Sequence, residues 1–146
     1  MKVTDIMTAD PACCTSDTSL RDVAQLMKDN DCGEIPIVDD LESRKLVGVV
    51  TDRDIACRGV AAGLDATTAV GDLMTRDVQW VDEDSGVSEC REKMEDHQVR
   101  RMPVVDAQGR ICGIVSQADI ARHASSRHTA ELVKDVSRPG GDVRQN

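Results

Sequence analysis

The chain contains an internal repeat, and this repeat constrains the fold more than any other feature. Three pairs of segments align in the same order: DIMTADPACCTSDTSL at 5–20 with DLMTRDVQWVDEDSGV at 72–87, EIPIVDD at 34–40 with RMPVVDA at 101–107, and LVGVVTDRDIA at 46–56 with ICGIVSQADIA at 111–121. Repeated units of this kind bury their apolar faces by packing on each other. The sequence therefore predicts two copies of one unit, related by pseudo-twofold symmetry.

The repeat also sets the expected domain boundaries. We expect the first copy at 1–61, a linker at 62–71 and the second copy at 72–124. A polar tail at 125–146 follows, in which TAELVKDVSRP predicts one short helix before a proline. A chain of 146 residues has the size of one ordinary domain or of two small lobes that share a core.

Each copy shows the same order of predicted elements. Apolar residues with the i, i+3, i+4, i+7 spacing of an amphipathic helix are Leu20, Val23, Ala24 and Met27 in the first copy and Val87, Cys90 and Met94 in the second. We expect Asp84 or Ser85 to cap the second of these helices. Two short apolar strands follow, at 35–38 and 46–50 and again at 102–105 and 111–115. The predicted fold is therefore mixed α/β, with the order strand, helix, strand, strand, helix in each copy.

Composition excludes several classes of function. The net charge of -9 disfavours a nucleic-acid backbone as partner, and a chain with one Trp and no Tyr or Phe lacks the stacking surfaces of single-strand binders. The N-terminus lacks the apolar segment of a signal peptide, so we expect a cytoplasmic protein. The three histidines are scattered and no nucleophile motif is present, so the sequence indicates no enzyme, no catalytic residue and no resident metal.

The stretch TDRDI, at residues 51–55, allows two interpretations. Thr51 can cap a helix while Asp54 reaches back to the cap residue, as in a capping box. Alternatively, Asp54 can accept the hydroxyls of a ribose while the hydroxyl and N–H groups at the helix start bind phosphate. The second copy repeats the pattern with Ser116 and Asp119. Both interpretations stay open for both copies.

The repeated motifs carry a family resemblance. Two ordered copies of I/L-M-T, of an apolar-Pro-apolar-Val-Asp strand and of G-h-h-T/S-x-x-D-I, where h is apolar, resemble a tandem pair of CBS domains, the Bateman module. The pattern is most similar to stand-alone bacterial proteins of the hypoxic-response type and covers residues 1–124. The resemblance implies a non-catalytic sensor that binds an adenosyl ligand: AMP, ADP, ATP, NAD or S-adenosylmethionine. It requires no further cofactor.

The resemblance also implies two clefts, each combining residues of both copies. The first, which we name the Thr51 cleft, is expected to contain Thr51, Arg53, Asp54, Asp77, Val78, Gln79, Val99, Arg100 and Arg101. The second, the Ser116 cleft, is expected to contain Asp10, Pro11, Ala12, Cys32, Ser116 and Asp119. Val99 and Cys32 are expected to line the adenine slots.

Basic residues predict that the clefts differ. Arg53, Arg100 and Arg101 belong to the Thr51 cleft, where arginine forks suit phosphate oxygens. The aligned positions for the Ser116 cleft are Ala118, Gly33 and Glu34, and none of these is cationic. We therefore expect the Thr51 cleft to bind a phosphate-bearing ligand more tightly. The alternative for Arg100 and Arg101 is an exposed strand edge that discourages sheet-to-sheet pairing.

The sequence also leaves two alternative functions open and predicts an oligomer. The six cysteines include the adjacent pair Cys13 and Cys14 but no C-x-x-C motif, so a redox or metal sensor is one alternative function. A ligand-free interaction module, which would regulate another protein, is the other. We also expect a homodimer, because twofold association covers apolar helix surface, with Leu20, Met27 and Met94 as candidate contacts.

Overall fold

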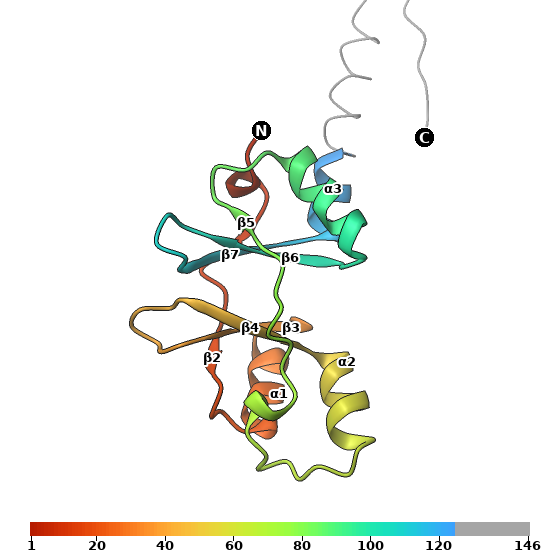
Figure 1. Ribbon diagram of the computed structural model, residues 1–146. Coiled ribbons are helices and arrows are strands. Elements are labelled where there is room, and N and C mark those ends of the chain that lie inside the picture. Colours follow the sequence, from red (N-terminus) through yellow and green to blue (C-terminus); the bar gives the residue numbers. More distant parts are fainter. Residues whose placement is uncertain (125–146) are drawn as a thin grey trace, which may run out of the picture.

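A computed structural model of the chain describes residues 1–124, and the tail at 125–146 with its predicted helix lies outside them. The described chain forms two halves, each with a small sheet and two helices, which lie one above the other in Figure 1. The predicted mixed α/β fold of two similar units is confirmed. No helix in this described part is both long and apolar enough to cross a membrane.

Both halves follow the predicted order of elements. The first half contains β2 (Cys14–Thr15), α1 (Leu20–Asp29), β3 (Glu34–Val38), β4 (Leu46–Thr51) and α2 (Asp52–Asp54), which continues as the π-helix η2 (Ile55–Val60). The second half contains β5 (Val81–Asp82), α3 (Val87–His97), β6 (Arg101–Val105), β7 (Ile111–Ser116) and a helix at 117–124. Each of the four strands is one residue longer than predicted. The strands β3 and β6 begin one residue earlier, and β4 and β7 end one residue later, directly before the final helix of their half.

The two halves exchange their N-terminal segments. Strand β1 (Thr8–Ala9) belongs to the first repeat in sequence, yet it pairs with β7 in the sheet of the second half, of order β1-β7-β6-β5. The sheet of the first half has the order β2-β3-β4, and the backbone of Thr75, from the second repeat, bonds to Val49 at its edge. Each sheet is therefore completed by a segment of the other repeat.

The exchange extends into both cores. Val3, on the 3₁₀-helix η1 (Val3–Asp5), is fully buried with Cys90 and Met102 of the second half. Leu73 and Met74, which follow the 3₁₀-helix η3 (Val70–Asp72) at the start of the second repeat, are likewise buried among residues of the first half. Because each core needs apolar residues from the other repeat, neither half has a complete core of its own.

Two glycines accommodate the methionines of the repeated I/L-M-T motif. A Cβ atom on Gly48 of β4 would lie 3.0 Å from Sδ of Met74 and 2.9 Å from the carbonyl oxygen of Thr75. A Cβ atom on Gly113 of β7 would collide with the side chain of Met7. Gly48 and Gly113 therefore allow the segments that contain Met74 and Met7 to lie directly on β4 and β7.

The helix caps show the same exchange. Ser19 caps α1 by accepting a hydrogen bond from Asp22 N, and Leu20 N donates to the carbonyl of Thr68. The predicted cap of α3 at Asp84 or Ser85 is wrong, because the N-cap residue is Gly86 and it makes no side-chain cap. Instead, Val87 N donates 3.1 Å to the carbonyl of Met1. A backbone acceptor from the other repeat replaces the expected side chain.

The apolar faces of the helices lie inside the halves. Leu20, Met27 and Met94 are 4%, 8% and 3% exposed and belong to the two cores. Their assignment as dimer contacts is therefore wrong, since side chains that fill a core are not available to a second copy. Dimerisation itself stays a prediction.

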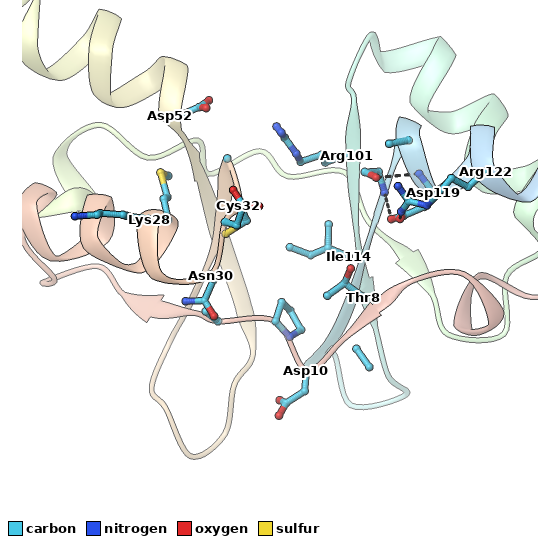
Figure 2. Close-up of a pocket in the computed structure, with 18 residues that line it drawn as sticks. Thr8, Asp10, Lys28, Asn30, Cys32, Asp52, Arg101, Ile114, Asp119 and Arg122 are labelled. Atoms are coloured by element: carbon cyan, nitrogen blue, oxygen red, sulfur yellow. Dashed lines mark hydrogen bonds and ion pairs between the residues drawn. The ribbon is translucent and has the colours of Figure 1, made fainter.

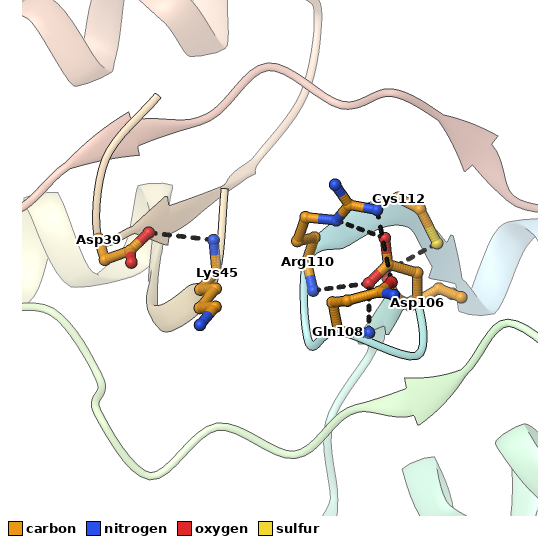
Figure 3. A network of polar contacts seen from close by, with 7 residues as sticks. Asp39, Lys45, Asp106, Gln108, Arg110 and Cys112 are labelled. Carbon is orange, nitrogen blue, oxygen red and sulfur yellow. Dashed lines mark hydrogen bonds and ion pairs between the residues drawn. The ribbon is translucent and has the colours of Figure 1, made fainter. Parts of the chain in front are cut away.

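The two hairpin turns hold the halves together at one end of the molecule. Asp39 organises the turn between β3 and β4 by accepting from Lys45 N, and Asp106 organises the other turn by accepting from Gln108 N and from Arg110 (Figure 3). The turns also bond to each other, because Ile111 N donates to the carbonyl of Arg44. The space left between the halves lies toward the other end of the sheets.

Candidate functional site

Two cavities lie between the halves, one at each predicted cleft. The Thr51 cleft has a volume of about 500 Å³ and the Ser116 cleft about 900 Å³. Both volumes fall in the range of small-molecule sites. The two cavities are related by the same pseudo-twofold symmetry as the repeats.

Strand pairing places the central residues of each cleft. Glu34, the first residue of β3, lies opposite Thr51, the last residue of β4. In the second half, Arg101 at the start of β6 lies opposite Ser116 at the end of β7. Because the final helices begin directly after Thr51 and Ser116, a charged residue, a hydroxyl and a helix start meet in each cleft.

The structure brings the predicted residues of the Thr51 cleft together, with one exception. The residues that line it as expected are Thr51, Arg53, Asp77, Val78, Gln79, Val99, Arg100 and Arg101. Sequence reasoning missed Glu34, Val49, Asp52, Thr75, Gln98 and Pro103. Several of these lie one or two residues from predicted positions, and Glu34 could have been found from the antiparallel register of the two strands.

Asp54 is the exception, because its side chain does not line the cavity. Its Oδ2 accepts a hydrogen bond from Thr51 N at 3.0 Å, and its own N–H donates to Thr51 Oγ1 at 3.1 Å. Its second oxygen, Oδ1, lies 3.9 Å from Nη1 of Arg58. The capping-box interpretation is therefore what this structure contains at Asp54.

The backbone donors of this helix start are also occupied. Asp52 N donates 2.9 Å to the carbonyl of Gly33, and Arg53 N donates to the side chain of Asp52. With Asp54 N bonded to Thr51, the first three N–H groups all have partners. The expectation that they bind phosphate is therefore not met here, and the arginine side chains remain as anion-binding groups.

All six predicted residues line the Ser116 cleft, shown in Figure 2: Asp10, Pro11, Ala12, Cys32, Ser116 and Asp119. Gly33 and Ala118, the aligned positions named for this cleft, also line it. Sequence reasoning missed ten others: Thr8, Ala9, Met27, Lys28, Asn30, Asp31, Asp52, Arg101, Ile114 and Arg122. Thr8 and Ile114 occupy the positions that align with Thr75 and Val49 of the other cleft. This part of the lining could have been read from the repeat.

Asp119 differs from Asp54 although the two aspartates align. It forms the same capping box, since Ser116 N donates to Asp119 Oδ2 at 2.8 Å and Asp119 N donates to Ser116 Oγ at 3.1 Å. Unlike Asp54, it lines the cavity, and its Oδ1 is paired with the guanidinium of Arg122 (Figure 2). The residue is 8% exposed, so this ion pair is partly shielded from water.

The expectation that the Ser116 cleft lacks cations is wrong. Lys28, Arg101 and Arg122 line it. The comparison of aligned positions could not find them, because Lys28 comes from α1, Arg122 lies one helical turn beyond Asp119, and Arg101 lies opposite Ser116 in the ladder. Four carboxylates, those of Asp10, Asp31, Asp52 and Asp119, accompany these cations.

Glu34 lies in the other cleft from the one predicted. It aligns with Arg101 and was expected beside Ser116, but it lines the Thr51 cleft. It is 8% exposed, and its Oε2 has no hydrogen-bond partner among the described residues. Burial raises the pKa of Glu34 to about 7, an effect that Arg101 opposes and Asp54 reinforces. This carboxyl is therefore partly protonated at neutral pH.

The cysteines show little of the chemistry of a redox or metal centre. Burial raises the pKa of Cys13, Cys14, Cys32, Cys90 and Cys112, those of Cys14 and Cys90 to about 11. The thiolate is the nucleophile and the metal ligand, so these thiols are held in their less reactive form. Within residues 1–124, no group of three or more His, Cys, Asp or Glu side chains could hold a metal ion.

Sequence comparison matches both repeats to one family. A family model described as CBS domain matches residues 3–58 and 70–126. The chain is 41% identical over 136 residues to Hypoxic response protein 1 of Mycobacterium tuberculosis, which covers 92% of this chain and 93% of that protein.

Comparison with solved structures gives the same result. A crystal structure of Hypoxic Response Protein I with two coordinated zinc ions has a TM-score of 0.75 at 43% identity, and it covers 84% of this chain and 98% of the other. The CBS domain pair of protein MJ0100, in complex with methylthioadenosine and S-adenosyl-L-methionine, has a TM-score of 0.77 at 32% identity over 87% and 98%. CBSX2 in complex with AMP has a TM-score of 0.74 at 26% identity over 87% and 98%.

Proposed function

Because the chain belongs to the CBS domain family, we propose that it is a non-catalytic regulatory module that binds adenosyl nucleotides in the Thr51 and Ser116 clefts. The observation that carries the proposal is the pair of cavities between the halves, each joining a hydroxyl at a helix start to arginine side chains. The complexes of two structural relatives with AMP and with S-adenosyl-L-methionine support this ligand class. Vicinal ribose hydroxyls and phosphate oxygens are the groups that such side chains recognise.

In the Thr51 cleft, we assign the phosphate to arginine. Arg53, Arg100 and Arg101 line the cavity, and within the described chain none of them has a carboxylate oxygen within 4.0 Å. Asp54 takes the ribose through Oδ1, the oxygen that the capping box leaves unused. Val99 and Val78 supply apolar surface for adenine. Rotation of Asp54 toward the cavity is the local change that this assignment requires.

In the Ser116 cleft, Asp119 is already at the cavity wall, but its Oδ1 is paired with Arg122. Ribose binding there competes with this ion pair. The cations left for phosphate are Lys28 and Arg101, and four carboxylates line the same cavity. We therefore keep the Thr51 cleft as the tighter site for a phosphate-bearing ligand, and assign to the larger Ser116 cleft a less anionic adenosyl ligand.

The zinc ions of Hypoxic Response Protein I are not carried over to this chain. The described residues form no group of three metal-binding side chains, and the raised pKa values of their thiols oppose metal binding. We also propose no catalysis, because neither cleft combines a nucleophile with a general base in the way that hydrolysis requires. ATP or NAD incubated with the protein is expected to be recovered intact.

Native mass spectrometry of freshly purified protein tests the proposed function. We expect co-purified or added AMP, ATP or NAD to bind without turnover, and a ligand at about 100 times its dissociation constant to stabilise the fold by about 2.7 kcal/mol. For a chain of this size the melting temperature then rises by roughly 5–10 °C. The absence of any mass increase or melting shift with all of these ligands, and with S-adenosylmethionine, would contradict the proposal.

A further inference from the structure

The two clefts share two of their lining residues, Asp52 and Arg101. Arg101 begins β6 opposite Ser116, so its backbone belongs to the Ser116 cleft. Its side chain reaches across to the first half, because a Cβ atom on Gly33 would lie 2.9 Å from Arg101 Nη2 and 3.0 Å from Asp52 Oδ2. Figure 2 shows Arg101 in the space between the halves, pointing toward the helix start that carries Asp52. One guanidinium therefore borders both cavities.

The N–H donors of the Arg101 guanidinium are not engaged in an ion pair with any described residue. Within residues 1–124, no carboxylate oxygen lies within 4.0 Å of its guanidinium nitrogens. Glu34 occupies the aligned position in the other repeat, and its buried Oε2 has no hydrogen-bond partner among residues 1–124. If the two repeats were identical, each cleft would have its own arginine at this position. Here Glu34 replaces one of them, so a single guanidinium at this position borders both sites.

We propose that Arg101 is one phosphate-binding group that the two clefts use in alternation, so that a phosphate-bearing ligand in one cleft weakens the binding of a second in the other. This inference rests on the proposed function of both clefts. A phosphate that takes two parallel hydrogen bonds from the guanidinium also neutralises its single positive charge, so a second phosphate in the other cleft meets fewer free donors and the repulsion of the first phosphate. The loss of affinity is reciprocal, because the coupling between two binding sites is the same from either side.

The experiment needs variants in which one cleft is filled. Gln79→Trp places an indole in the Thr51 cleft, and Ala118→Trp, at an exposed position, places one in the Ser116 cleft. Each is combined with Arg101→Ala and titrated with AMP and with adenosine, which lacks the phosphate. Arg21→Ala, which removes an exposed arginine that lines neither cleft, is the control for net charge.

Sharing of Arg101 predicts a specific pattern. With either cleft filled, Arg101→Ala lowers the affinity for AMP by about 10- to 150-fold, which corresponds to the loss of one charge-assisted hydrogen bond. The affinity for adenosine stays nearly unchanged. In the wild type, native mass spectrometry shows the second AMP binding at least about tenfold more weakly than it binds to the corresponding single-cleft variant. Two adenosines bind without this penalty, and Arg21→Ala changes none of these values.

Three results overturn the inference. An effect of Arg101→Ala in only one of the two single-cleft variants would assign Arg101 to one cleft alone. Equal AMP affinities in the wild type and in the single-cleft variants, or tighter binding of the second AMP, would exclude alternation. If no variant binds adenosine or AMP, the proposed function fails together with the inference. Binding of two AMP molecules without coupling refutes the inference alone.

Discussion

The Thr51 and Ser116 clefts occupy equivalent places in the two repeats, yet they handle charge in different ways. In the Thr51 cleft, the capping aspartate Asp54 does not line the cavity, and three arginines border the cavity without ion pairs to described residues. In the Ser116 cleft, Asp119 lines the cavity and is paired with Arg122. The comparison teaches that a shared backbone plan fixes where the two cavities lie, whereas a few charged side chains set the charge that each cavity presents.

The residues that begin β3 and β6 contribute to this difference in charge between the clefts. Glu34 and Arg101 align in sequence, lie opposite Thr51 and Ser116 respectively, and carry opposite charges. Glu34 is confined to one cleft, while Arg101 borders both. Variants that change residues at corresponding places in the two clefts, one at a time, test whether the clefts differ.

The largest effect is expected from Glu34→Gln, measured as unfolding free energy against pH. Glu34 has a pKa of about 7 in the folded chain and 4.5 as its ordinary value. As the pH rises, the Glu34 carboxyl therefore loses its proton in the unfolded state before it does so in the folded state. The contribution of Glu34 to the free energy of unfolding is fully present below about pH 4.5 and is lost as the pH rises through about 7. At about 1.4 kcal/mol per pKa unit, the wild type loses about 2–3 kcal/mol relative to Glu34→Gln between pH 5 and pH 8.

Urea denaturation at several pH values measures this difference, with Glu92→Gln on the exposed face of α3 as the control. The control is expected to follow the wild type. A constant difference in stability between Glu34→Gln and the wild type over this pH range would show that Glu34 is ionised normally in the folded protein.

The second effect concerns the aligned aspartates. Asp54→Ala is expected to weaken AMP in the Thr51 cleft by about 10- to 150-fold, because a charge-assisted bond to the ribose is lost. Asp119→Ala is expected to lower the AMP affinity of the Ser116 cleft by a smaller factor, because the same change releases Arg122 to bind phosphate. Calorimetry with AMP, ATP and NAD measures both, with Asp96→Ala as an exposed control.

The two aspartate variants also separate binding from capping. Each variant loses the bond from the cap residue's N–H to the aspartate but keeps the bond that Thr51 or Ser116 accepts, so a stability loss of about 0.5–1.5 kcal/mol is expected in each. If Asp119→Ala abolishes the tighter site and Asp54→Ala spares it, the assignment of the clefts is reversed. If neither change alters affinity, both aspartates serve only as helix caps.

A third prediction compares the crossing segments that frame the clefts. Gly48→Ala places a methyl group 2.9 Å from the backbone oxygen of Thr75, which bonds to Val49 and cannot move without loss of that bond, so a destabilisation of about 1–3 kcal/mol is expected. The three atoms nearest to a methyl group on Gly113 all belong to the side chain of Met7, which is half-buried and can change its rotamer, so a smaller cost is expected for Gly113→Ala than for Gly48→Ala. Thermal unfolding of both variants checks the order, and equal costs would contradict it.

The smallest effect is expected for exposed cations at the cleft rims. Arg53→Ala is expected to weaken AMP in the Thr51 cleft by about 1.5- to 5-fold, and Lys28→Ala to do the same in the Ser116 cleft, as is usual for exposed ion pairs. Adenosine affinity is expected to stay unchanged in both, because neither side chain reaches the nucleoside in this assignment. Titration at two salt concentrations checks the result, and a loss of adenosine affinity would place these side chains at the base or ribose.

The amino-acid sequence by itself determined the repeat, the order of elements and part of the lining of both clefts; of the predicted lining residues, only Asp54 does not line its cavity. These follow from local signals: strand and helix periodicity, glycines and prolines, and the alignment of two copies. Even the missed Thr8, Thr75, Val49 and Ile114 occupy aligned positions. Repetition makes each half a template for the other, so that local patterns suffice to locate a site between them.

The tertiary structure alone decided which charges share a cleft. Whether Glu34 lies beside Thr51 depends on the strand register, and whether Arg101 serves one cavity or two depends on how far its long side chain reaches across the interface between the halves. The pairing of Asp119 with Arg122, and the backbone of Met1 in place of a side-chain cap on α3, are likewise contacts that alignment cannot see. Side-chain reach and register act between segments distant in sequence, and only packing of the whole chain sets them.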